Sequence, residues 1–394
     1  MKKAKNVLSL VLVGAVFVPL TLAAWCTPPK AFSISERRKL AQRPELTLEA
    51  VLDGSYMTNF QLFAQDQFPL RNTFRRLKAV TTYSILRQRE NNGIYIQDGY
   101  AAKLDYPLDE ASVTHATDRF SYIYERNLSG KNMNIYFSVV PDKNYFLAAE
   151  NGYPAMDYTK LIQMMRAEMN YADYIDITSS LDISDYYKTD AHWRQEKLED
   201  TAAVLMEGMG AGQSSGNVGK DALEAGNTSS SHPQETSSGG GYAAKYKLHA
   251  LDRPFYGVYY AQSALPLPAE TLYYLTNDVL DQCVVTNYET GSIGGIYDMN
   301  AAEGKDPYDI FLSGARPLMT IENPNAEGEK ELIIFRDSFG SSIAPLLISD
   351  YRKMTLVDIR YLRADFLDRF IDFDGQDVLF LYSTGVLNHS ETLT

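Results

Sequence analysis

The sequence predicts an α/β fold with a mostly parallel central sheet, preceded by an N-terminal membrane anchor or signal segment. Apolar runs typical of buried strands, at 134–140, 332–335 and 378–382, alternate with stretches of helical periodicity. Strands that alternate with helices in this way are joined by crossovers and tend to pair in parallel. A chain of 394 residues, 45% of them apolar, is long enough to bury the core that such a fold needs.

The N-terminal segment, residues 1–30, has three lysines among its first five residues and continues as an uncharged, largely apolar run from Val7 to Trp25. About twenty such residues span a bilayer, with the basic end inside. A cleaved signal peptide is the competing interpretation, because small residues at 21–24 would suit a peptidase. Either interpretation places the rest of the chain on the extracytoplasmic face of the cell membrane, or outside the cell if the segment is cleaved.

The second segment, residues 31–90, is predicted to be a juxtamembrane connector followed by helices. Within the helical part, Phe60 and Phe63, and then Phe74 and Leu77, recur at the short steps that place side chains on one helix face. This periodicity is typical of a helix pair whose apolar face packs on something larger.

The third segment, residues 91–394, is predicted to be the α/β domain itself. It opens with a strand at 91–99 that an Asp-Gly turn closes. Residues 208–241 are rich in Gly, Ser, Asn and Thr and lack the apolar side chains that a packed core requires. We therefore expect a disordered insertion there, with no functional site in it.

The composition excludes some classes of function. A formal net charge of −13, without an extended basic region beyond the first 40 residues, argues against nucleic acid as a partner. The two cysteines, Cys26 and Cys283, are too far apart to form a disulfide framework or to suggest metal-ligand spacing. We expect no metal site.

Residues 331–348 read as a strand, a tight polar turn and a helix, with Ser338 in the turn. This arrangement holds a hydroxyl at the end of a buried strand, beside backbone N–H groups that can stabilise an oxyanion. The alternative is an ordinary loop in which Asp337 and Ser338 only cap the following helix. The stretch alone does not decide between the two.

A second motif contains the residue types that catalysis by Ser338 would need. Among the five histidines, only His192 lies in a turn with a nearby carboxylate, that of Asp190. A nucleophilic serine needs a base that takes its proton and a carboxylate that orients the base, and these two residues offer both. The alternative is that Asp190 caps a helix opening near Trp193 and that His192 is an ordinary, partly buried residue.

Further candidates follow from the rule that open α/β sheets bind ligands beyond the carboxyl ends of their strands. Lys143, Arg360 and Tyr382 each lie at or just beyond the end of a predicted strand. A structural or surface role is the alternative for each of them.

The two motifs together carry a family resemblance. Thr189-Asp-Ala-His-Trp193, followed by Phe335-Arg-Asp-Ser-Phe-Gly340, resembles the DHHW proteins of Gram-positive bacteria and, more broadly, the SGNH-hydrolase-like domains of the alginate O-acetylation proteins. Segments 66–71 and 92–99 extend the resemblance to about residues 35–390, the insertion excepted. The resemblance implies a three-layer SGNH-hydrolase-like fold in which Ser338 is the nucleophile, His192 the general base and Asp190 its orienting partner.

Two positions depart from the family pattern. Ala191 replaces the first histidine of the family name, and we take that position as non-catalytic. Arg336 stands where Gly is usual before the Asp-Ser pair, which would alter the oxyanion hole. Both Arg336 and the neighbouring Phe339 are candidate contacts for the substrate or the oxyanion.

The resemblance also implies a function. It predicts an O-acetyltransferase that acetylates a cell-envelope or exported polysaccharide through an acyl-serine intermediate, without a soluble cofactor. The acetyl group would come from a membrane-bound O-acyltransferase in the same membrane. Two alternatives stay open: a carbohydrate esterase with the same triad, and a non-catalytic polysaccharide-binding or assembly protein of the same fold.

Overall fold

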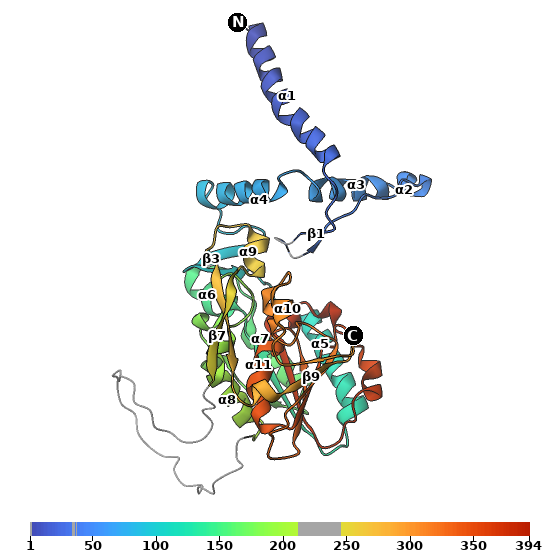
Figure 1. The fold of residues 1–394 in the computed structure, drawn as a ribbon, viewed down its shortest axis with the longest axis vertical. Coiled ribbons are helices and arrows are strands. Elements are labelled where there is room, and N and C mark those ends of the chain that lie inside the picture. Colours follow the sequence, from blue (N-terminus) through green and yellow to red (C-terminus); the bar gives the residue numbers. More distant parts are fainter. Residues whose placement is uncertain (1, 34–35, 37, 212–245) are drawn as a thin grey trace, which may run out of the picture. The chain divides into compact units, whose positions relative to one another are not determined.

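The computed structural model describes residues 2–33, 36, 38–211 and 246–394, which form two compact units. The first unit comprises Met1–Leu104, Tyr187–Ala191 and Phe255–Glu270, and the second comprises Asp105–Tyr186, His192–Pro254 and Thr271–Thr394 (Figure 1). The predicted insertion at 208–241 lies outside the described residues from 212 onward.

The second unit is built around an eight-stranded sheet with the strand order β10-β9-β11-β13-β12-β14-β5-β6. Four neighbouring pairs, from β13 through β12, β14 and β5 to β6, are parallel, and the other three are antiparallel. The strands are β5 (Asn134–Val140), β6 (Asp173–Tyr174), β9 (Val284–Asn287), β10 (Ser292–Gly294), β11 (Leu318–Glu322), β12 (Glu331–Arg336), β13 (Lys353–Val357) and β14 (Asp377–Ser383).

Helices connect and cover these strands. They are α5 (Glu110–Ile123), α6 (Lys143–Asn151), α7 (Tyr158–Glu168), α8 (Glu199–Gly208), α10 (Met299–Ala302), α11 (Gly340–Leu347) and α12 (Thr384–Leu387). Two further strands, β7 (Lys247–Phe255) and β8 (Glu270–Thr276), form a separate two-stranded sheet. Short 3₁₀ turns lie at Thr178–Ser180, Ile183–Asp185, Gln195–Lys197, Leu280–Gln282, Pro307–Ile310, Ile348–Asp350, Ala364–Arg369 and Ser390–Thr392.

Apolar cores on both faces of the sheet make the second unit three-layered. Along β12, Leu332 and Ile334 belong to one core, and Ile333 and Phe335 belong to the other. This division arises because successive side chains of a strand point to opposite faces. Helices α8 and α11 contribute to the first core, and α5 and α7 contribute to the second. The predicted α/β class with a mostly parallel central sheet is confirmed.

The first unit contains the N-terminal helices and two hairpins. Its elements are α1 (Lys2–Cys26), β1 (Phe32–Ser33), β2 (Arg38–Lys39), α2 (Leu48–Leu52), α3 (Ser55–Asp66), α4 (Arg71–Val80), a π-helical turn (Thr81–Ile85), β3 (Ile94–Gln97), β4 (Tyr100–Lys103) and α9 (Val258–Ser263). Asp98 and Gly99, with φ angles of 52° and 83°, form the tight turn between β3 and β4, as the Asp-Gly signal predicts.

Helix α1 includes the predicted N-terminal membrane segment. Its 21 residues Asn6–Cys26 have a mean hydropathy of 2.5, so the helix is long and apolar enough to cross a membrane. Both an anchor and a signal sequence have this length and composition.

The helices predicted after this segment are present, but their packing differs from the expectation. Neither α2 nor α3 has a buried residue, and α4 buries only Ala79. Within the described residues, the apolar face of these helices is therefore not covered by another part of the protein. Periodicity identifies an apolar face and says nothing about what covers it.

Gly340 begins α11 at a point where strand β12 passes very close. A Cβ atom at this position would lie 2.7 Å from Cβ of Arg336, which is closer than two side-chain carbons approach in proteins. We predict that Gly340→Ala lowers the free energy of unfolding by about 1–3 kcal/mol, because a buried strand or helix must move.

Chemical denaturation of the two proteins measures this difference. The matched control is Gly294→Ala, because a Cβ atom at Gly294 meets nothing within 4 Å. Equal denaturation midpoints for the Gly340 and Gly294 variants would contradict the prediction.

Candidate active site

Ser338 is the middle residue of the three-residue turn between β12 and α11, at the carboxyl edge of the parallel sheet. Its Oγ is 2.7 Å from Nε2 of His192, which is hydrogen-bond distance. Both residues are partly exposed, whereas Asp337, Phe339 and Trp193 next to them are buried. The structure thus joins the two predicted residues across 146 positions of sequence, and solvent can reach both.

Asp337 fixes the conformation of the turn. Its Oδ1 accepts a hydrogen bond from the Phe339 N–H at 3.0 Å, and its Oδ2 accepts one from the Ser383 N–H at 2.8 Å. Helix α11 has no side-chain N-cap. The Ser338 hydroxyl therefore does not cap this helix and lies at hydrogen-bond distance from His192 instead.

The imidazole of His192 lies between aromatic rings. The Tyr308 ring stacks on it with centroids 4.1 Å apart and planes 13° apart, and the Phe339 ring lies 4.9 Å away. The Tyr308 hydroxyl also donates to Ser342 Oγ at 2.7 Å. Sequence reasoning missed Tyr308, since no local motif marks a ring that reaches the histidine from a loop 116 positions later in the chain.

Trp193 and Gln195 attach the histidine segment to α11. The indole Nε1 of Trp193 donates to Phe339 O at 3.1 Å and to Ser342 Oγ at 2.8 Å. Gln195 Nε2 donates to Ser342 O at 2.9 Å, while its Oε1 accepts the Leu275 N–H at 2.8 Å. Both side chains are fully buried, so these contacts hold His192 in register with the Ser338 turn.

Asp190 belongs to the first unit. It is fully buried, and its Oδ2 accepts a hydrogen bond from the Val258 N–H at 2.7 Å. Gly257 passes so close that a Cβ atom there would lie 2.3 Å from Cα of Asp190. The helix α8 begins only at Glu199, so Asp190 is not its cap. The role of Asp190 as the partner of His192 stays a prediction from their spacing.

Arg336 does not face a substrate, contrary to our expectation. Its side chain is fully buried, and its Nη1 donates to Ser341 Oγ at 2.8 Å and to Asp337 O at 3.2 Å. Its Nη2 donates to Gly314 O at 3.4 Å. Burial lowers the pKa of Arg336, and the nearby carboxylate of Asp358 opposes this shift. The guanidinium supports the turn from inside the protein.

The other residues predicted to contact the substrate or the oxyanion are mostly buried or held in an ion pair. Tyr382 and Lys143 are each 2% exposed, so neither is available to a substrate, which corrects the expectation from their strand-end positions. Arg360 makes an ion pair with Asp358, with 2.6 Å between Nη2 and Oδ2. Burial alone would lower the pKa of Arg360, but the hydrogen bonds and charge of Asp358 raise it above its usual value. Of these predicted contacts, Phe339 alone lies against the Ser338–His192 pair, with its ring centroid 4.9 Å from that of His192.

The backbone N–H groups around Ser338 differ in their availability. The N–H groups of Phe339, Gly340 and Ser341 donate to Asp337 Oδ1, Asp337 O and Ser338 O. In the part of the chain that the structure describes, no hydrogen bond uses the Ser338 N–H. This group is thus the candidate oxyanion donor nearest to the hydroxyl.

Among the residues described, no group of three or more His, Cys, Asp or Glu side chains could hold a metal ion. Cys26 is exposed and Cys283 is buried, and neither forms a disulfide. Burial raises the pKa of the Cys283 thiol to about 11.

These features define an α/β protein with an accessible serine–histidine pair at the carboxyl edge of a mostly parallel sheet.

No protein-family model matches the chain, and no curated protein matches it in sequence. Among solved structures, a DHHW family protein from Eubacterium siraeum is 20% identical over 77% of this chain and 95% of its own, with a TM-score of 0.56. The structure of Bacillus cereus PatB1 with a sulfonyl adduct is 20% identical over 75% of this chain and 95% of its own, with a TM-score of 0.51.

The resemblance to the DHHW proteins is confirmed at the level of the fold. At 20% identity the likeness says nothing further about substrate or mechanism.

Asp142 follows β5 at the same edge of the sheet and caps α6. Its Oδ1 accepts the Tyr158 O–H at 2.6 Å and the Tyr145 N–H at 3.1 Å. Burial raises the pKa of Asp142 to about 6, and the hydrogen bond from Tyr158 opposes the shift only in part. The protonated form is therefore favoured in the folded protein relative to the unfolded chain.

We predict a pH-dependent contribution of Asp142 to stability. Because the pKa in the folded protein is raised, this stabilisation is fully present below about pH 4 and is lost as the pH rises to about 6. In Asp142→Asn, whose amide oxygen still accepts both hydrogen bonds, this loss is absent. Denaturation midpoints between pH 4 and 7 measure it, with Asp157→Asn at the exposed N-cap of α7 as the control. Parallel pH profiles for wild type and Asp142→Asn would contradict the prediction.

Proposed function

We propose that this protein is an extracytoplasmic O-acetyltransferase that acetylates a cell-envelope or exported polysaccharide through an acyl-Ser338 intermediate. The observation that carries the proposal is the distance of 2.7 Å between Ser338 Oγ and His192 Nε2. A non-catalytic protein of the same fold has no need to keep this pair in contact and partly exposed.

The proposed reaction has two steps. In the first, His192 Nε2 accepts the Ser338 proton while Oγ attacks the acetyl carbonyl of the donor. The tetrahedral oxyanion accepts a hydrogen bond from the Ser338 N–H. As the carbonyl re-forms, the donor's leaving group departs with the proton from His192, and acetyl-Ser338 remains.

In the second step, a sugar hydroxyl attacks acetyl-Ser338. His192 accepts the proton of that hydroxyl and returns it to Ser338 Oγ when the ester bond to the serine breaks. The product is an acetylated sugar, and the enzyme regains its starting protonation state. Asp190 would orient His192 and stabilise its protonated form. Burial and the hydrogen bond from the Val258 N–H would fix the position of the Asp190 carboxylate for this role.

The N-terminal helix supports the proposed location of the protein. Helix α1 is apolar and long enough to cross a membrane, which supports a protein held at the extracytoplasmic face of the cell membrane. A membrane-bound O-acyltransferase in the same membrane would then supply the acetyl groups.

The second candidate function is a carbohydrate esterase, in which water replaces the sugar hydroxyl as the acceptor. The partial exposure of Ser338 and His192 favours it, since bulk water can reach the acyl-enzyme. The two functions share the first step and differ only in the acceptor.

We predict that a sulfonyl fluoride labels Ser338 and no other residue of the protein. His192 activates Oγ, which attacks sulfur and displaces fluoride, so mass spectrometry should find one adduct, at Ser338. Replacing the base in His192→Gln should slow labelling by about 10²–10⁴-fold. In Ser338→Ala the adduct should be absent, and O-acetylation of the polysaccharide should fall at least about a thousandfold.

The matched control is Ser349→Ala, which removes an exposed serine just beyond α11 and should label like the wild type. Unchanged polysaccharide acetylation in cells that express only Ser338→Ala would rule out the proposed function.

We also predict that the acyl group goes to sugar in preference to water. The purified protein is incubated with an acetyl ester donor and an envelope oligosaccharide, and acetylated sugar and free acetate are both measured. Transfer predicts that acetylated sugar exceeds free acetate, and that added oligosaccharide speeds loss of the donor. Free acetate that does not change with oligosaccharide would instead support the esterase.

A further inference from the structure

Helices α2, α3 and α4 and the loops around them carry large apolar side chains on the surface. Fourteen such residues between 46 and 86 are exposed, from 38% for Val80 to 78% for Leu52. Soluble proteins seldom expose so many large apolar residues in one short segment. Short helices that bury none of their side chains also gain little stability from their own sequence. Both facts indicate that this surface is covered in the functional protein.

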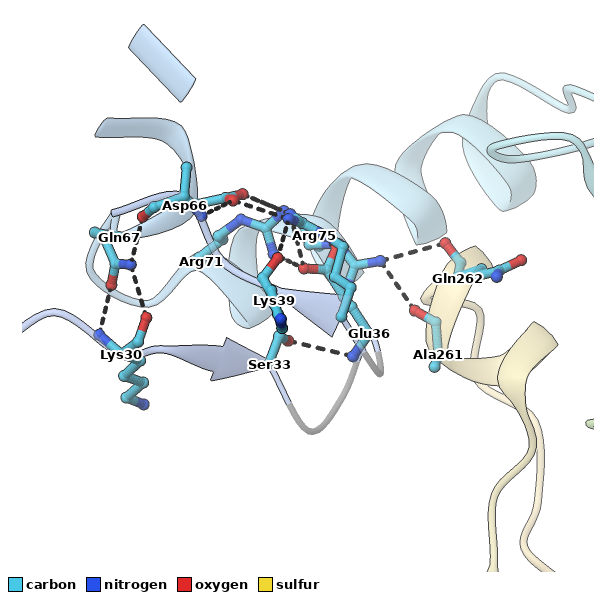
Figure 2. Close-up of polar contacts among 12 residues, drawn as sticks. Lys30, Ser33, Glu36, Lys39, Asp66, Gln67, Arg71, Arg75, Ala261 and Gln262 are labelled. Atoms are coloured by element: carbon cyan, nitrogen blue, oxygen red, sulfur yellow. Dashed lines mark hydrogen bonds and ion pairs between the residues drawn. The ribbon is translucent and has the colours of Figure 1, made fainter. Parts of the chain in front are cut away.

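Helix α4 places its polar face, and not its apolar face, against the rest of the first unit. Its polar face points to the protein, where Arg75 donates to Ala261 O at 2.9 Å and to Gln262 O at 3.3 Å, as Figure 2 shows. Arg75 also pairs with Glu36, with 3.0 Å between Nε and Oε1. A helix on a soluble protein normally packs its apolar face inward. In α4, Leu77 is instead 60% exposed.

Two carboxylates beside α3 and α4, those of Glu36 and Asp66, are neutralised within the first unit, whereas Glu45, Glu49 and Asp53 around α2 are exposed. Asp66, which ends α3, forms ion pairs with Arg38 and Arg71, and the hydrogen bond from Arg38 lowers its pKa to about 2 (Figure 2). Glu36 likewise pairs with Arg71 and Arg75. These acids therefore face arginines of their own unit and do not present an exposed negative surface.

The segment that carries α4 is strongly basic, although the whole chain has a net charge of −13. Residues 67–89 contain no Asp or Glu and six basic residues, namely Arg71, Arg75, Arg76, Lys78, Arg87 and Arg89. A helix with Phe and Leu on one side and Arg and Lys on the other is typical of an interfacial membrane helix. Arg71 and Arg75 are paired with Glu36 and Asp66, so the charges of Arg76, Lys78 and Arg87 are those that match the anionic lipids of a membrane surface.

Three observations favour lipid over a protein partner as the occupant of this surface. The exposed apolar side chains extend over consecutive helices, and α3 adds an aromatic stripe of Tyr56, Phe60 and Phe63 with successive ring centroids 6.0 Å apart. The basic residues are interleaved with the apolar ones. The segment also begins about 20 residues after α1, so a membrane crossed by α1 would lie within its reach.

We propose that α2, α3 and α4 lie in the interfacial plane of a membrane that contains anionic lipids, with their apolar side chains inserted. The protein then has a second membrane attachment, distinct from α1 and parallel to the membrane surface. This inference does not depend on the acetyltransferase proposal.

Site-directed spin labelling of the full chain in vesicles tests this inference. In a Cys26→Ser, Cys283→Ala background, a nitroxide is attached at Leu77→Cys, with Leu52→Cys and Phe60→Cys as independent sites. The vesicles contain phosphatidylcholine and phosphatidylglycerol. Collision with oxygen, which concentrates in lipid, is compared with collision with a water-soluble nickel chelate.

The matched control is Ile293→Cys in β10, because Ile293 is 72% exposed in the second unit. We expect a several-fold higher ratio of oxygen to nickel collision at the three helix sites than at 293. A ratio at the helix sites equal to that at 293 would overturn the proposal and leave the surface for a protein partner. Labels whose depth does not change when phosphatidylglycerol is omitted would overturn the part of the proposal that concerns anionic lipid.

Discussion

The geometry of the candidate site depends on the carboxylate of Asp337. This carboxylate is fully buried. It accepts hydrogen bonds from the N–H of Phe339, which precedes α11, and from the N–H of Ser383, which ends β14. Two backbone donors in a dry interior would be costly to leave without a partner. This pair of bonds therefore fixes the path of the chain on both sides of Ser338 and keeps its hydroxyl at the edge of the sheet.

The two neighbours of this carboxylate explain the rest of the motif. Arg336 supports the turn from below through the Asp337 carbonyl and the Ser341 hydroxyl, and Asp358 partly offsets the cost of burying its charge. Gly340 is required because α11 passes within contact of the Arg336 stem. The arginine that departs from the family pattern is thus an internal support of the turn and not a substrate contact.

Local sequence signals predicted much of the fold. The alternation of strands and helices, the Asp-Gly hairpin and the Ser338 turn depend on short-range periodicity and turn chemistry. The Ser338–His192 contact joins distant parts of the chain, so local signals identified each residue as a candidate and the family resemblance paired them. Tyr308 and Gln195 have no local motif at all, because their roles depend on neighbours that only folding brings together.

The errors have physical causes as well. The strand-end rule located Tyr382 at the right edge of the sheet, but side chains alternate along a strand, and Tyr382 points into the apolar core beside Phe380. For α4, periodicity identified the apolar face. It could not predict that Arg75 would bind Ala261 O and so place the polar face against the protein. The overall acidic charge also concealed the basic segment at 67–89.

Because Ser338 is partly exposed, an acyl group on it would be open to attack by water as well as by a sugar hydroxyl. Water is far more concentrated than any sugar hydroxyl, and both nucleophiles can use the same base, His192. Transfer to sugar therefore requires that the acceptor itself covers Ser338 and displaces water from it. The residues that hold Ser338 and His192 together are buried and do not change this accessibility. Under the proposed function, selectivity for the acceptor would reside in the exposed surroundings of the pair, and the motif residues would set the reactivity of Ser338.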